Sequence, residues 1–539
     1  EIAVRVIRAC RELGIQSVAV YSELDRNALH TRLADEAYAL GGETAADSYL
    51  NTDKILEIIE TAGIDAVHPG YGFFSENAEF AQAITEKGVT FIGPPVGAIA
   101  VMGDKISARQ AAEKVGVSGV PGTSDFITSA SEVENFAAEH GYPVAIKAAY
   151  GGGGRGMKVV LNKDEIQAAI DSSKREALAY FGRDEIYMER YLTKPRHVEV
   201  QVLCDQHGNA VYLGTRDCSA QRRHQKLIEE APAFDIPGHI LRAMGEAAVA
   251  VAKGCDYVNA GTVEFLYENE EFYYLEMNTR LQVEHPVTEM VTGIDLVEQQ
   301  LRVAFGEELS IRQEDIEITG HAIEVRINAE DPAEGQFLPS PGKLTTFKAS
   351  AGFGTRWDGG YEEGDEISQF YDNLVGKLIC WGKDRETAIA RTIRALEEFE
   401  VAGLSTTIPA DLAILKHPDF QENKHSTKWV EDGLDLTGVK GSPIENSEAG
   451  SASVIRTTDV EVDGKRFSVS MSVPSGKSQI RRSASATGAS ASGGDGQITV
   501  PMQGTIVKIQ VAVGDTVQSG DILLVLEAMK MENNIASDV

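Results

Sequence analysis

Apolar and polar positions alternate with different periods along the chain, and the changes of period divide it into regions. At the start, Ile2, Val6, Cys10 and Leu13 recur on one face at helical spacing, which predicts an amphipathic helix. The elements expected next are a strand at 17–21, a helix at 54–62, a strand at 66–68, a helix at 76–86 and a strand at 90–92. Strands that alternate with helices favour a parallel, doubly wound sheet.

From about residue 105 the pattern changes to hairpins mixed with helices. The clearest hairpin joins Thr262–Leu266 to Phe272–Asn278. A third region begins with the strand Ile323–Ile327, is rich in short strands, and ends with a helix expected at Thr387–Phe399. These patterns together predict a multidomain chain of the α/β and α+β classes.

The stretch Gly438–Gly496 is different in kind, because it is rich in Ser, Gly and Ala. Its part 477–494 has no periodicity and is predicted to be a flexible linker. One short hairpin, with strands at 458–462 and 466–470, is expected to interrupt it.

The final segment reads as strand, turn and strand from Gly504 to Leu526, and then reaches Ala528-Met529-Lys530-Met531. A lysine at the tip of a tight turn can be reached by a modifying enzyme, and methionines beside it offer an adaptable apolar surface. Taken alone, the motif also fits an ordinary surface lysine between core methionines.

Composition narrows the classes of partner. The chain has 539 residues and a formal net charge of -32, so nucleic acid and anionic membranes would repel it. It has no apolar run long enough to cross a bilayer and no signal peptide. Five cysteines lie scattered without a Cys-x-x-Cys pair, which indicates a reduced, cytoplasmic protein without a zinc site. Phosphate ligands remain compatible with this charge, because local cations and backbone amides hold them.

A glycine-rich loop at 150–156 connects two predicted strands. Such a loop can fold over phosphates and offer backbone N–H groups without side-chain clashes. No helix with Lys-Ser/Thr follows it, so it is neither a P-loop nor a dinucleotide motif. Lys147 and Lys105 could supply cations to the same phosphates. The loop alone fits a disordered tip equally well.

Three oxygen-bearing side chains lie on the clearest hairpin. Glu276 and Asn278 are two residues apart on one strand and share a face, and Glu264 on the partner strand can join them. Hard oxygen ligands of this kind suit magnesium that bridges nucleotide phosphates. Surface acids on a solvated hairpin are the alternative.

Two further segments, 279–289 and 221–226, are dense in Arg, Gln, Glu, His and Lys. Each could bind a small anion beside the metal hairpin, although a basic loop in an acidic protein is often a solvated face.

Together these segments resemble the ATP-grasp biotin carboxylase family, and the final segment resembles the biotinyl carrier domain. The resemblance rests on six motifs, which are His68–Asn77, the glycine loop, Arg196–Glu199, Gln221–Lys226, Glu276–Glu289 and Arg326–Asp331. It extends from Glu1 to about Asp432 and returns after the linker. A carboxylase and a carrier on one chain, without a carboxyltransferase, are similar to the alpha subunit of an actinobacterial acyl-CoA carboxylase.

The resemblance implies five regions. They are a doubly wound pre-ATP-grasp domain at 1–101, an ATP-grasp domain at 102–318, a small β-rich C-terminal carboxylase domain at 319–432, a linker with a short hairpin at 433–497, and the first half of an all-β biotinyl domain at 498–539. The family has a strand and a glycine turn before the residue that matches Glu1, and more carrier strands after Met531. We therefore expect a chain shortened at both ends, whose Lys530 is a weak substrate for biotin ligase.

The family assigns roles to matching positions. ATP contacts are implied for Lys105, Lys147, Gly153, Gly154, Glu189, Leu192, His197, His224, Glu264 and Glu276. Magnesium or manganese binding is implied for Glu264, Glu276 and Asn278, and bicarbonate binding for Lys226, Arg280, Gln282 and Val283. Glu284 would be the base that deprotonates bicarbonate, Arg326 would face the ureido oxygen of biotin, and Lys530 would carry the biotin.

The implied reaction is ATP-dependent carboxylation of biotin through carboxyphosphate. The implied partners are a carboxyltransferase beta subunit that carboxylates acetyl- or propionyl-CoA for fatty-acid synthesis, a biotin protein ligase, and a second copy of the carboxylase part. The carboxylase portion of a pyruvate or urea carboxylase is an alternative, although 433–497 is too short for the barrel domain of the former. An inactive carrier scaffold is another, but Glu284, Lys226 and Arg280 are all present.

Overall fold

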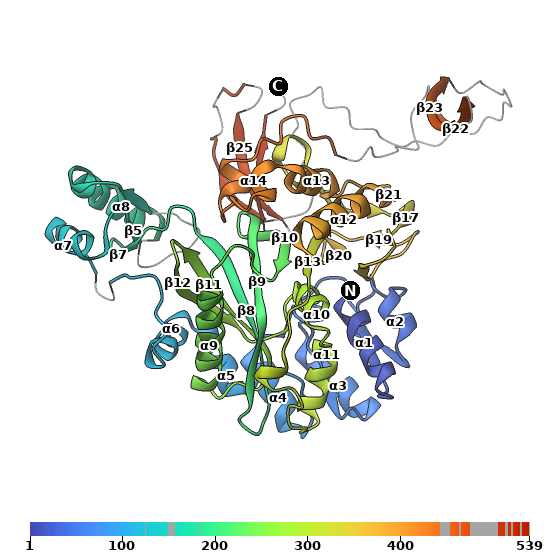
Figure 1. Cartoon of the computed structure of the whole chain (residues 1–539), viewed down its shortest axis with the longest axis horizontal. Helices are drawn as coiled ribbons and strands as arrows, with labels where there is room; N and C mark the ends of the chain where they lie inside the picture. Colours follow the sequence, from blue (N-terminus) through green and yellow to red (C-terminus); the bar gives the residue numbers. More distant parts are fainter. Residues whose placement is uncertain are drawn as a thin grey trace.

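The N-terminal region contains two parallel strand pairs with helices around them (Figure 1). The computed structural model describes residues 1–123, 126–148, 157–181, 183–441, 453–462, 465–474, 505–512, 516–518, 521–528 and 531–537. The first strands are β1 (Val18–Tyr21), β2 (Glu36–Ala39), β3 (Ala66–Val67) and β4 (Thr90–Phe91). The helices are α1 (Ile2–Glu12), α2 (Leu29–Leu33), α3 (Thr52–Ala62), α4 (Ala78–Glu86) and α5 (Val96–Gly103). Because β1 pairs with β2 and β3 with β4 in parallel, the expected strand direction is confirmed.

Helix α1 uses the face that its periodicity predicted. Cys10 is buried in a cluster with residues of α11 (Leu296–Ala304), and Ile2, Val6 and Leu13 pack against that cluster. The predicted apolar stripe therefore fixes the start of the chain against a helix almost 300 residues away in the sequence.

One eight-stranded antiparallel sheet forms the centre of the molecule and joins the second and third regions. Its order is β12-β11-β8-β9-β10-β13-β20-β18. The bounds are β8 (Arg196–Cys204), β9 (Ala210–Arg222), β10 (Gln225–Ala231), β11 (Asn259–Glu268), β12 (Glu271–Asn278), β13 (His321–Asn328), β18 (Thr355–Gly359) and β20 (Leu374–Gly382). The predicted hairpin is β11–β12, with Glu264 opposite Glu276 and Thr262 opposite Asn278.

The sheet crosses the expected boundary near residue 318 without a break. Strand β13 pairs directly with β10, with Glu229 opposite Glu324 and Ile228 opposite Val325. The segment that resembles the C-terminal carboxylase domain therefore supplies strands to the same sheet as the segment that resembles an ATP-grasp domain. This pairing brings Arg326 of β13 beside β10 and the residues that β10 carries.

Strand β8 explains how polar side chains come to lie inside the sheet. Val198, Val200 and Val202 pack in a core with residues of α9 (Gly238–Gly254), which lies over one face (Figure 1). His197 and Glu199 alternate with these valines and therefore point to the other face, where they are buried as well. The apolar face holds the sheet together, and the polar face is available for chemistry.

A small three-stranded sheet, β6-β5-β7, projects from one side of the molecule with two helices (Figure 1). Its elements are α7 (Ala130–His140), β5 (Val144–Ala148), β6 (Lys158–Val160), α8 (Ile166–Phe181) and β7 (Ile186–Arg190). Strands β5 and β6 are antiparallel, as expected for strands on either side of the glycine loop. The loop itself, including Gly153 and Gly154, lies outside the described residues.

The third region packs around β20 and ends in short helices. They are α12 (Arg385–Glu397), α13 (Ile408–Lys416), α14 (Pro418–Gln421) and α15 (Trp429–Asp432). The helix expected at Thr387–Phe399 is α12, which begins and ends two residues earlier. Arg385 of α12 is buried and forms an ion pair at 2.6 Å with Glu230 of β10, and His321 of β13 binds the same carboxylate at 2.7 Å. These buried contacts connect α12 to both β10 and β13.

The predicted hairpin in the linker is present as β22 (Ser453–Val462) and β23 (Lys465–Pro474). The final segment forms β24 (Thr505–Ile509), β25 (Ile522–Ala528) and β26 (Met531–Ala536) in one antiparallel sheet. Ala528 pairs with Met531, so this hairpin brackets the predicted tip. Lys530 and the linker stretch 477–494 lie outside the described residues.

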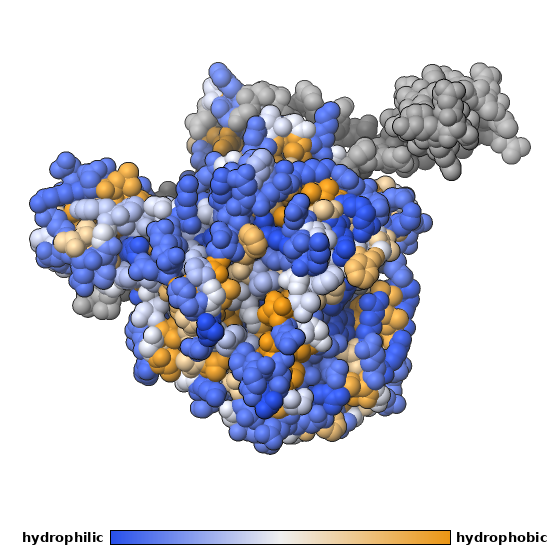
Figure 2. Space-filling model, in the orientation of Figure 1, coloured by the Kyte–Doolittle hydropathy of each residue, from blue (hydrophilic) through white to orange (hydrophobic). Residues whose placement is uncertain are grey.

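Hydrophilic side chains cover most of the face in Figure 2, with apolar groups scattered between them. No helix in the described part of the chain combines the length and apolar character needed to cross a membrane.

Replacement of Phe265 by Ala should destabilise the central sheet. The ring is completely buried on β11 and meets Phe272 edge-on at 5.3 Å, so its loss leaves a cavity worth about 3–5 kcal/mol. We expect a fall in the melting temperature of about 6–20 °C in calorimetry. Phe305→Ala is the matched control, since that ring is 82% exposed and its loss should change stability by less than about 0.5 kcal/mol. Equal melting temperatures for both variants would contradict this packing.

Asp411 makes the stability of the third region depend on pH. Burial, and then Glu330, raise the pKa of this carboxyl well above its usual range. The folded chain therefore holds the proton more tightly than the unfolded chain, and stability is lost as pH rises above the ordinary pKa of Asp. Asp411→Asn should gain several degrees of melting temperature over the parent at pH 8 and less at pH 5.

Asp384→Asn is the control for this pH series. Asp384 caps α12, and its hydrogen bonds from Thr387 lower its pKa below the ordinary value of Asp, so it stays ionised at both pH 5 and pH 8 and its removal should change the melting temperature equally at both. A melting-temperature gain of Asp411→Asn that is the same at both pH values would refute the buried neutral carboxyl.

Candidate active site

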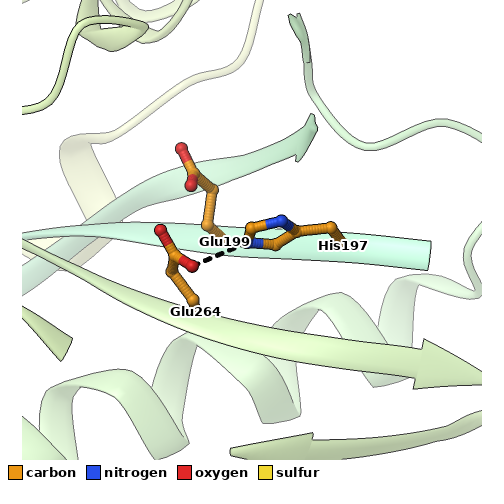
Figure 3. A group of neighbouring side chains, drawn as sticks. All are labelled: His197, Glu199 and Glu264. Atoms are coloured by element: carbon orange, nitrogen blue, oxygen red, sulfur yellow. Dashed lines mark ion pairs between the residues drawn. The ribbon is translucent and has the colours of Figure 1, made fainter. Parts of the chain in front are cut away.

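The polar face of β8 and β11 gathers acidic and imidazole side chains in a buried position (Figure 3). His197 and Glu199 come from β8, and Glu264 comes from the neighbouring β11, directly opposite Glu199. His197 Nε2 lies 2.8 Å from a Glu264 oxygen. Burial disfavours the charged imidazole, but the adjacent Glu264 outweighs this and raises the pKa of His197. The face is thus strongly negative and needs cations.

Lys226 of β10 supplies one cation at the centre of this face. Its ammonium lies 2.7 Å from Glu199, 3.2 Å from Glu264 and 2.6 Å from Glu284. Desolvation alone would lower the pKa of Lys226, but these carboxylates and the Cys218 sulfur keep it well above its usual range. The lysine is therefore charged. It connects its own strand β10 to β8, to β11 and to the loop after β12 that carries Glu284.

Arg216 of β9 supplies a second cation deeper in the same face, where it is completely buried. Its guanidinium donates to Glu199, Gln201, Thr262, Gln282 and Thr288. Because Gln282 also donates to Glu264 at 2.8 Å, Arg216 fixes the start of the anion-binding loop against the sheet. A buried guanidinium with this many acceptors holds geometry as well as charge.

The carboxylate of Glu284 lies between two cations. Lys226 contacts one oxygen, and Arg326 of β13 contacts the other at 2.9 Å. Burial alone would raise the pKa of Glu284, but Lys226, Arg326 and Arg216 hold it well below its usual range. Arg326 also donates to Glu229 at 2.6 Å. Glu284 is therefore ionised and oriented in this state.

The loop that carries Glu284 is fixed at several other points. Arg280 donates to Glu76 at 3.0 Å and to the side-chain oxygen of Asn278 at 2.9 Å. The backbone oxygen of Val283 accepts a 2.6 Å hydrogen bond from Lys377 of β20. The structure thus brings together all four residues expected to bind bicarbonate with the expected base and Arg326.

Two described carboxylates and an amide fit a divalent cation. Glu264 and Glu276 face each other across the hairpin, where like charges directly opposite are destabilising without a counter-charge. Partial burial and the neighbouring Glu264 raise the pKa of Glu276. Asn278 donates to Glu264 at 2.9 Å. Hard oxygen donors at this place suit Mg²⁺ or Mn²⁺.

A second possible set of ligands consists of His197, Glu199 and Glu264, whose ligand atoms lie within 4.8 Å of one another. Lys226 already places its ammonium against both carboxylates of that set. The lysine therefore provides the positive charge at Glu199, and Glu276 on the outer strand β12 is left to complete a metal site with Glu264.

The residues expected around the nucleotide come from separate elements. Lys105 begins α6 (Lys105–Lys114), and its charge reaches Glu276. Lys147 of β5 forms an ion pair with Glu189 of β7, and Leu192 is buried just beyond that strand. His224 lies in the two-residue turn between β9 and β10, where both Arg223 and His224 have positive φ. Such a conformation is costly for non-glycine residues and is often kept at functional turns.

Sequence reasoning assigned no role to three residues that organise this site, namely Glu199, which ends one of the family motifs, Arg216 and Lys377. A weak signal existed for Glu199, because polar residues alternate with valines at 197, 199 and 201. The side chains of Arg216 and Lys377 contact residues remote in the sequence, such as Thr288 and Val283, so no local pattern reveals those contacts.

Comparisons with known proteins agree with this arrangement. Matches cover residues 1–99 by "Biotin carboxylase, N-terminal domain", 104–312 by "Carbamoyl-phosphate synthase L chain, ATP binding domain", 324–432 by "Biotin carboxylase C-terminal domain" and 496–539 by "Biotin-requiring enzyme". The biotin-dependent acyl-coenzyme A carboxylase alpha3 subunit of Mycobacterium leprae is 48% identical over 100% of this chain and 92% of its own length.

Two further relatives extend this picture. The mitochondrial methylcrotonoyl-CoA carboxylase subunit alpha of Mus musculus is 40% identical over 99% of this chain and 88% of its own length. The biotin carboxylase domain dimer of Hydrogenobacter thermophilus 2-oxoglutarate carboxylase, solved with MgADP, ADP and bicarbonate, has a TM-score of 0.70 and 45% identity. It covers 80% of this chain and 95% of that chain.

The ATP-grasp sheet, its buried charged face and these matches define an ATP-dependent biotin carboxylase. The chain belongs to the biotin carboxylase family, in the form that joins the carboxylase to a biotin-requiring segment, as in acyl-CoA carboxylase alpha subunits.

Removal of one carboxylate from the β11–β12 hairpin should weaken metal binding. We predict that Glu264→Gln lowers the affinity for Mn²⁺ in the presence of ADP by at least about tenfold, measured by electron paramagnetic resonance of free Mn²⁺. Glu270→Gln, in the exposed turn of the same hairpin, is the control and should bind Mn²⁺ like the parent. Unchanged affinity in Glu264→Gln would move the metal away from this hairpin.

Proposed function

We propose that this chain carboxylates biotin at the face formed by β8–β13 and passes the carboxyl group to a separate carboxyltransferase subunit. The observation that carries the proposal is the placement of Glu284 between Lys226 and Arg326, beside the loop held by Arg280 and Gln282. We also propose the region limits 1–101, 102–318, 319–432, 433–497 and 498–539 for its parts, and a cytoplasmic location.

Bicarbonate would bind among Lys226, Arg280, Gln282 and the backbone of Val283. It is a poor nucleophile until it loses its proton, so a carboxylate base beside cations is needed. Glu284 is ionised here and its neighbours fix its direction, but the same cations lower its pKa and so hold it as a weak base in this state. The arrival of bicarbonate and biotin would compete for Lys226 and Arg326, which would release Glu284 and make it a stronger base.

ATP would lie between the projecting sheet and the polar face. Lys105, Lys147, His197, His224, Gly153 and Gly154 would contact its phosphates and ribose, with Glu189 and Leu192 at the adenine. Glu264, Glu276 and Asn278 would hold Mg²⁺ or Mn²⁺, which supplies charge neutralisation at the transferring phosphoryl group. Closure of the projecting sheet would exclude water from carboxyphosphate, the labile product of bicarbonate attack.

Biotin would enter beside Arg326. Carboxyphosphate yields carbon dioxide and phosphate, and that phosphate would take the proton from the ureido nitrogen of biotin. The developing negative charge on the ureido oxygen needs a fixed cation, which Arg326 would provide. Its hydrogen bond to Glu229 leaves the guanidinium anchored while its other side turns from Glu284 to biotin.

We propose Lys530 as the biotin-bearing residue, biotin protein ligase as the enzyme that loads it, and a carboxyltransferase beta subunit as the acceptor of its carboxyl group. Acetyl- or propionyl-CoA would be the final acceptor, which the likeness to acyl-CoA carboxylase alpha subunits supports. The dimer seen for the Hydrogenobacter thermophilus domain supports a homodimer of the carboxylase part.

Free biotin allows the carboxylase to be tested without the carrier. The chain with MgATP should release ADP only when bicarbonate is present, and free biotin should raise that rate. Glu284→Gln should lower the biotin-dependent rate by about 10²–10⁴-fold, because the base is lost while size and polarity remain. Glu270→Gln, in the exposed turn of the β11–β12 hairpin, should leave the rate unchanged. A rate that persists in Glu284→Gln would remove this residue from the role of base.

A further inference from the structure

Two glutamates lie opposite each other on neighbouring strands of the central sheet, close to Arg326. Glu229 of β10 is the direct partner of Glu324 of β13, and both side chains are completely buried. Side chains directly opposite in an antiparallel pair have Cβ atoms about 4.5–5.5 Å apart and share a face of the sheet. Like charges at such positions repel each other, so the two carboxyls need a means of avoiding that repulsion. We name Glu229 and Glu324 the acid pair.

Arg326 lies on the same face as the acid pair, because it follows Glu324 by two residues on β13. Its Nε donates to Glu229 at 2.6 Å, and one of its terminal nitrogens donates to Glu284 at 2.9 Å. Ile323, the residue before Glu324, packs into the core of the third region instead. The acid pair therefore adjoins the cation that would face biotin.

The acid pair has more acceptors than donors around it. One oxygen of Glu229 and both oxygens of Glu324 have no hydrogen-bond partner in the described part of the chain. The nearby ammonium of Lys377 is engaged elsewhere, since it lies 2.8 Å from Glu1 and donates to the backbone oxygen of Val283 at 2.6 Å. A buried carboxylate without a partner is too costly to persist as an anion. One proton held between the two carboxyls would supply the missing donor.

Charged and titratable groups from several elements surround the acid pair. They are Arg326 on β13, Lys226 on β10, Lys377 on β20, Cys218 on β9, Glu284 in the loop after β12, Asp411 on α13, and His285 on α10, the helix that packs against both strands. Burial raises the pKa of both carboxyls, and this is opposed mainly by Arg326 at Glu229 and by Lys377 at Glu324. The pair therefore keeps a proton at a pH where an exposed glutamate has lost it.

We propose that the acid pair holds one shared proton and that this proton lets Arg326 turn from Glu284 to biotin. The inference rests on the proposed function, because it assumes that Arg326 faces the ureido oxygen. With the proton in place the pair carries one negative charge, which anchors Nε of Arg326 and no more. Loss of the proton to bulk base adds a second negative charge two residues from Arg326. That charge holds the guanidinium at the sheet and offsets the positive charge that the ureido oxygen needs.

The acid pair gives the biotin step a pH dependence of one sign. The protonated pair supports that step, so its rate is retained below the pKa of the pair and lost as the pH rises through it. Attack of bicarbonate on ATP uses Glu284 and Lys226 and does not require Arg326 to move to biotin. The ratio of ADP release with free biotin to ADP release without it therefore isolates the effect of the pair.

Glu324→Gln tests this ratio between pH 6 and pH 9.5, because glutamine can donate to Glu229 but cannot ionise. In the parent chain the ratio should fall by about tenfold per pH unit above the pKa of the pair, whereas in Glu324→Gln it should vary by less than about twofold. Glu324→Asp restores an ionisable group and should restore the fall. Glu330→Gln, at another completely buried carboxyl whose pKa burial raises, is the control and should keep the parent's fall. Absence of a fall in the parent, or the same fall in Glu324→Gln, would overturn the proposal.

Infrared spectroscopy detects the proton without any need for activity. At pH 7.5 the parent should show one C=O stretching band of a protonated carboxylic acid that Glu324→Gln lacks. Glu270→Gln, at an exposed position, should remove no such band, because an exposed glutamate is ionised at this pH. An unchanged band in Glu324→Gln would show that the acid pair holds no proton.

Glu229→Gln is a second variant, which decides the matter if Glu324→Gln does not fold. It removes the acceptor of Nε of Arg326, so the ratio should fall about tenfold at pH 7, where the parent has its full ratio. Equal losses with and without biotin would assign Glu229 a structural role and overturn the positioning role. Failure of the parent to release ADP in response to bicarbonate and biotin would instead refute the proposed function, and the infrared band would still decide whether the pair holds a proton.

Discussion

The structure depends on one largely buried cation, the ammonium of Lys226 among the carboxylates of Glu199, Glu264 and Glu284. Transfer of a charge from water into a protein interior costs several kcal/mol, and three carboxylates without a partner could not be buried together. Arg216 adds the second positive charge behind them. The polar face of the sheet can therefore close over an ionised base only because these two cations lie on adjacent strands, β9 and β10.

This constraint explains why neither region forms the candidate active site alone. Arg326 completes the pairing of Glu284, yet it comes from β13, on the far side of the expected boundary. The position of Arg326 relative to β10 is fixed because β10 and β13 are paired in one register of the same sheet. The candidate active site is thus formed where two regions of the chain meet, at the pairing of β10 with β13. The buried ion pair between Glu230 and Arg385 stabilises the same junction.

Local patterns predicted much of the fold and the main chemistry. The apolar stripe of α1, the β11–β12 hairpin, the linker hairpin and helix α12 all follow from periodicities of 3.6 or 2 within short windows. Most site residues came from the family motifs, and the structure places Lys226, Arg280, Gln282, Glu284 and Arg326 together. The spacing of Glu276 and Asn278 identified one face of the hairpin from the sequence alone.

The rest of the fold and of the site depends on contacts between residues that lie too far apart in the sequence for a local pattern to reveal. The single sheet through two regions, the five acceptors of Arg216 and the ring contacts among Tyr49, Phe73 and Tyr371 all join residues separated by more than ten positions, and some by hundreds. Burial on both faces also hides strands such as β8, because their polar residues are inside as well.

The order of strands in the central sheet has a consequence for synthesis of the chain. Strand β10 ends at Ala231, but its neighbour β13 ends at Asn328, about 100 residues later. At about 5–20 residues per second, a ribosome would leave the β10 edge without its partner for about 5–20 s. During that time its unpaired N–H and C=O groups could template aggregation between nascent chains. The yield of folded protein would therefore depend on protection of this edge during that interval.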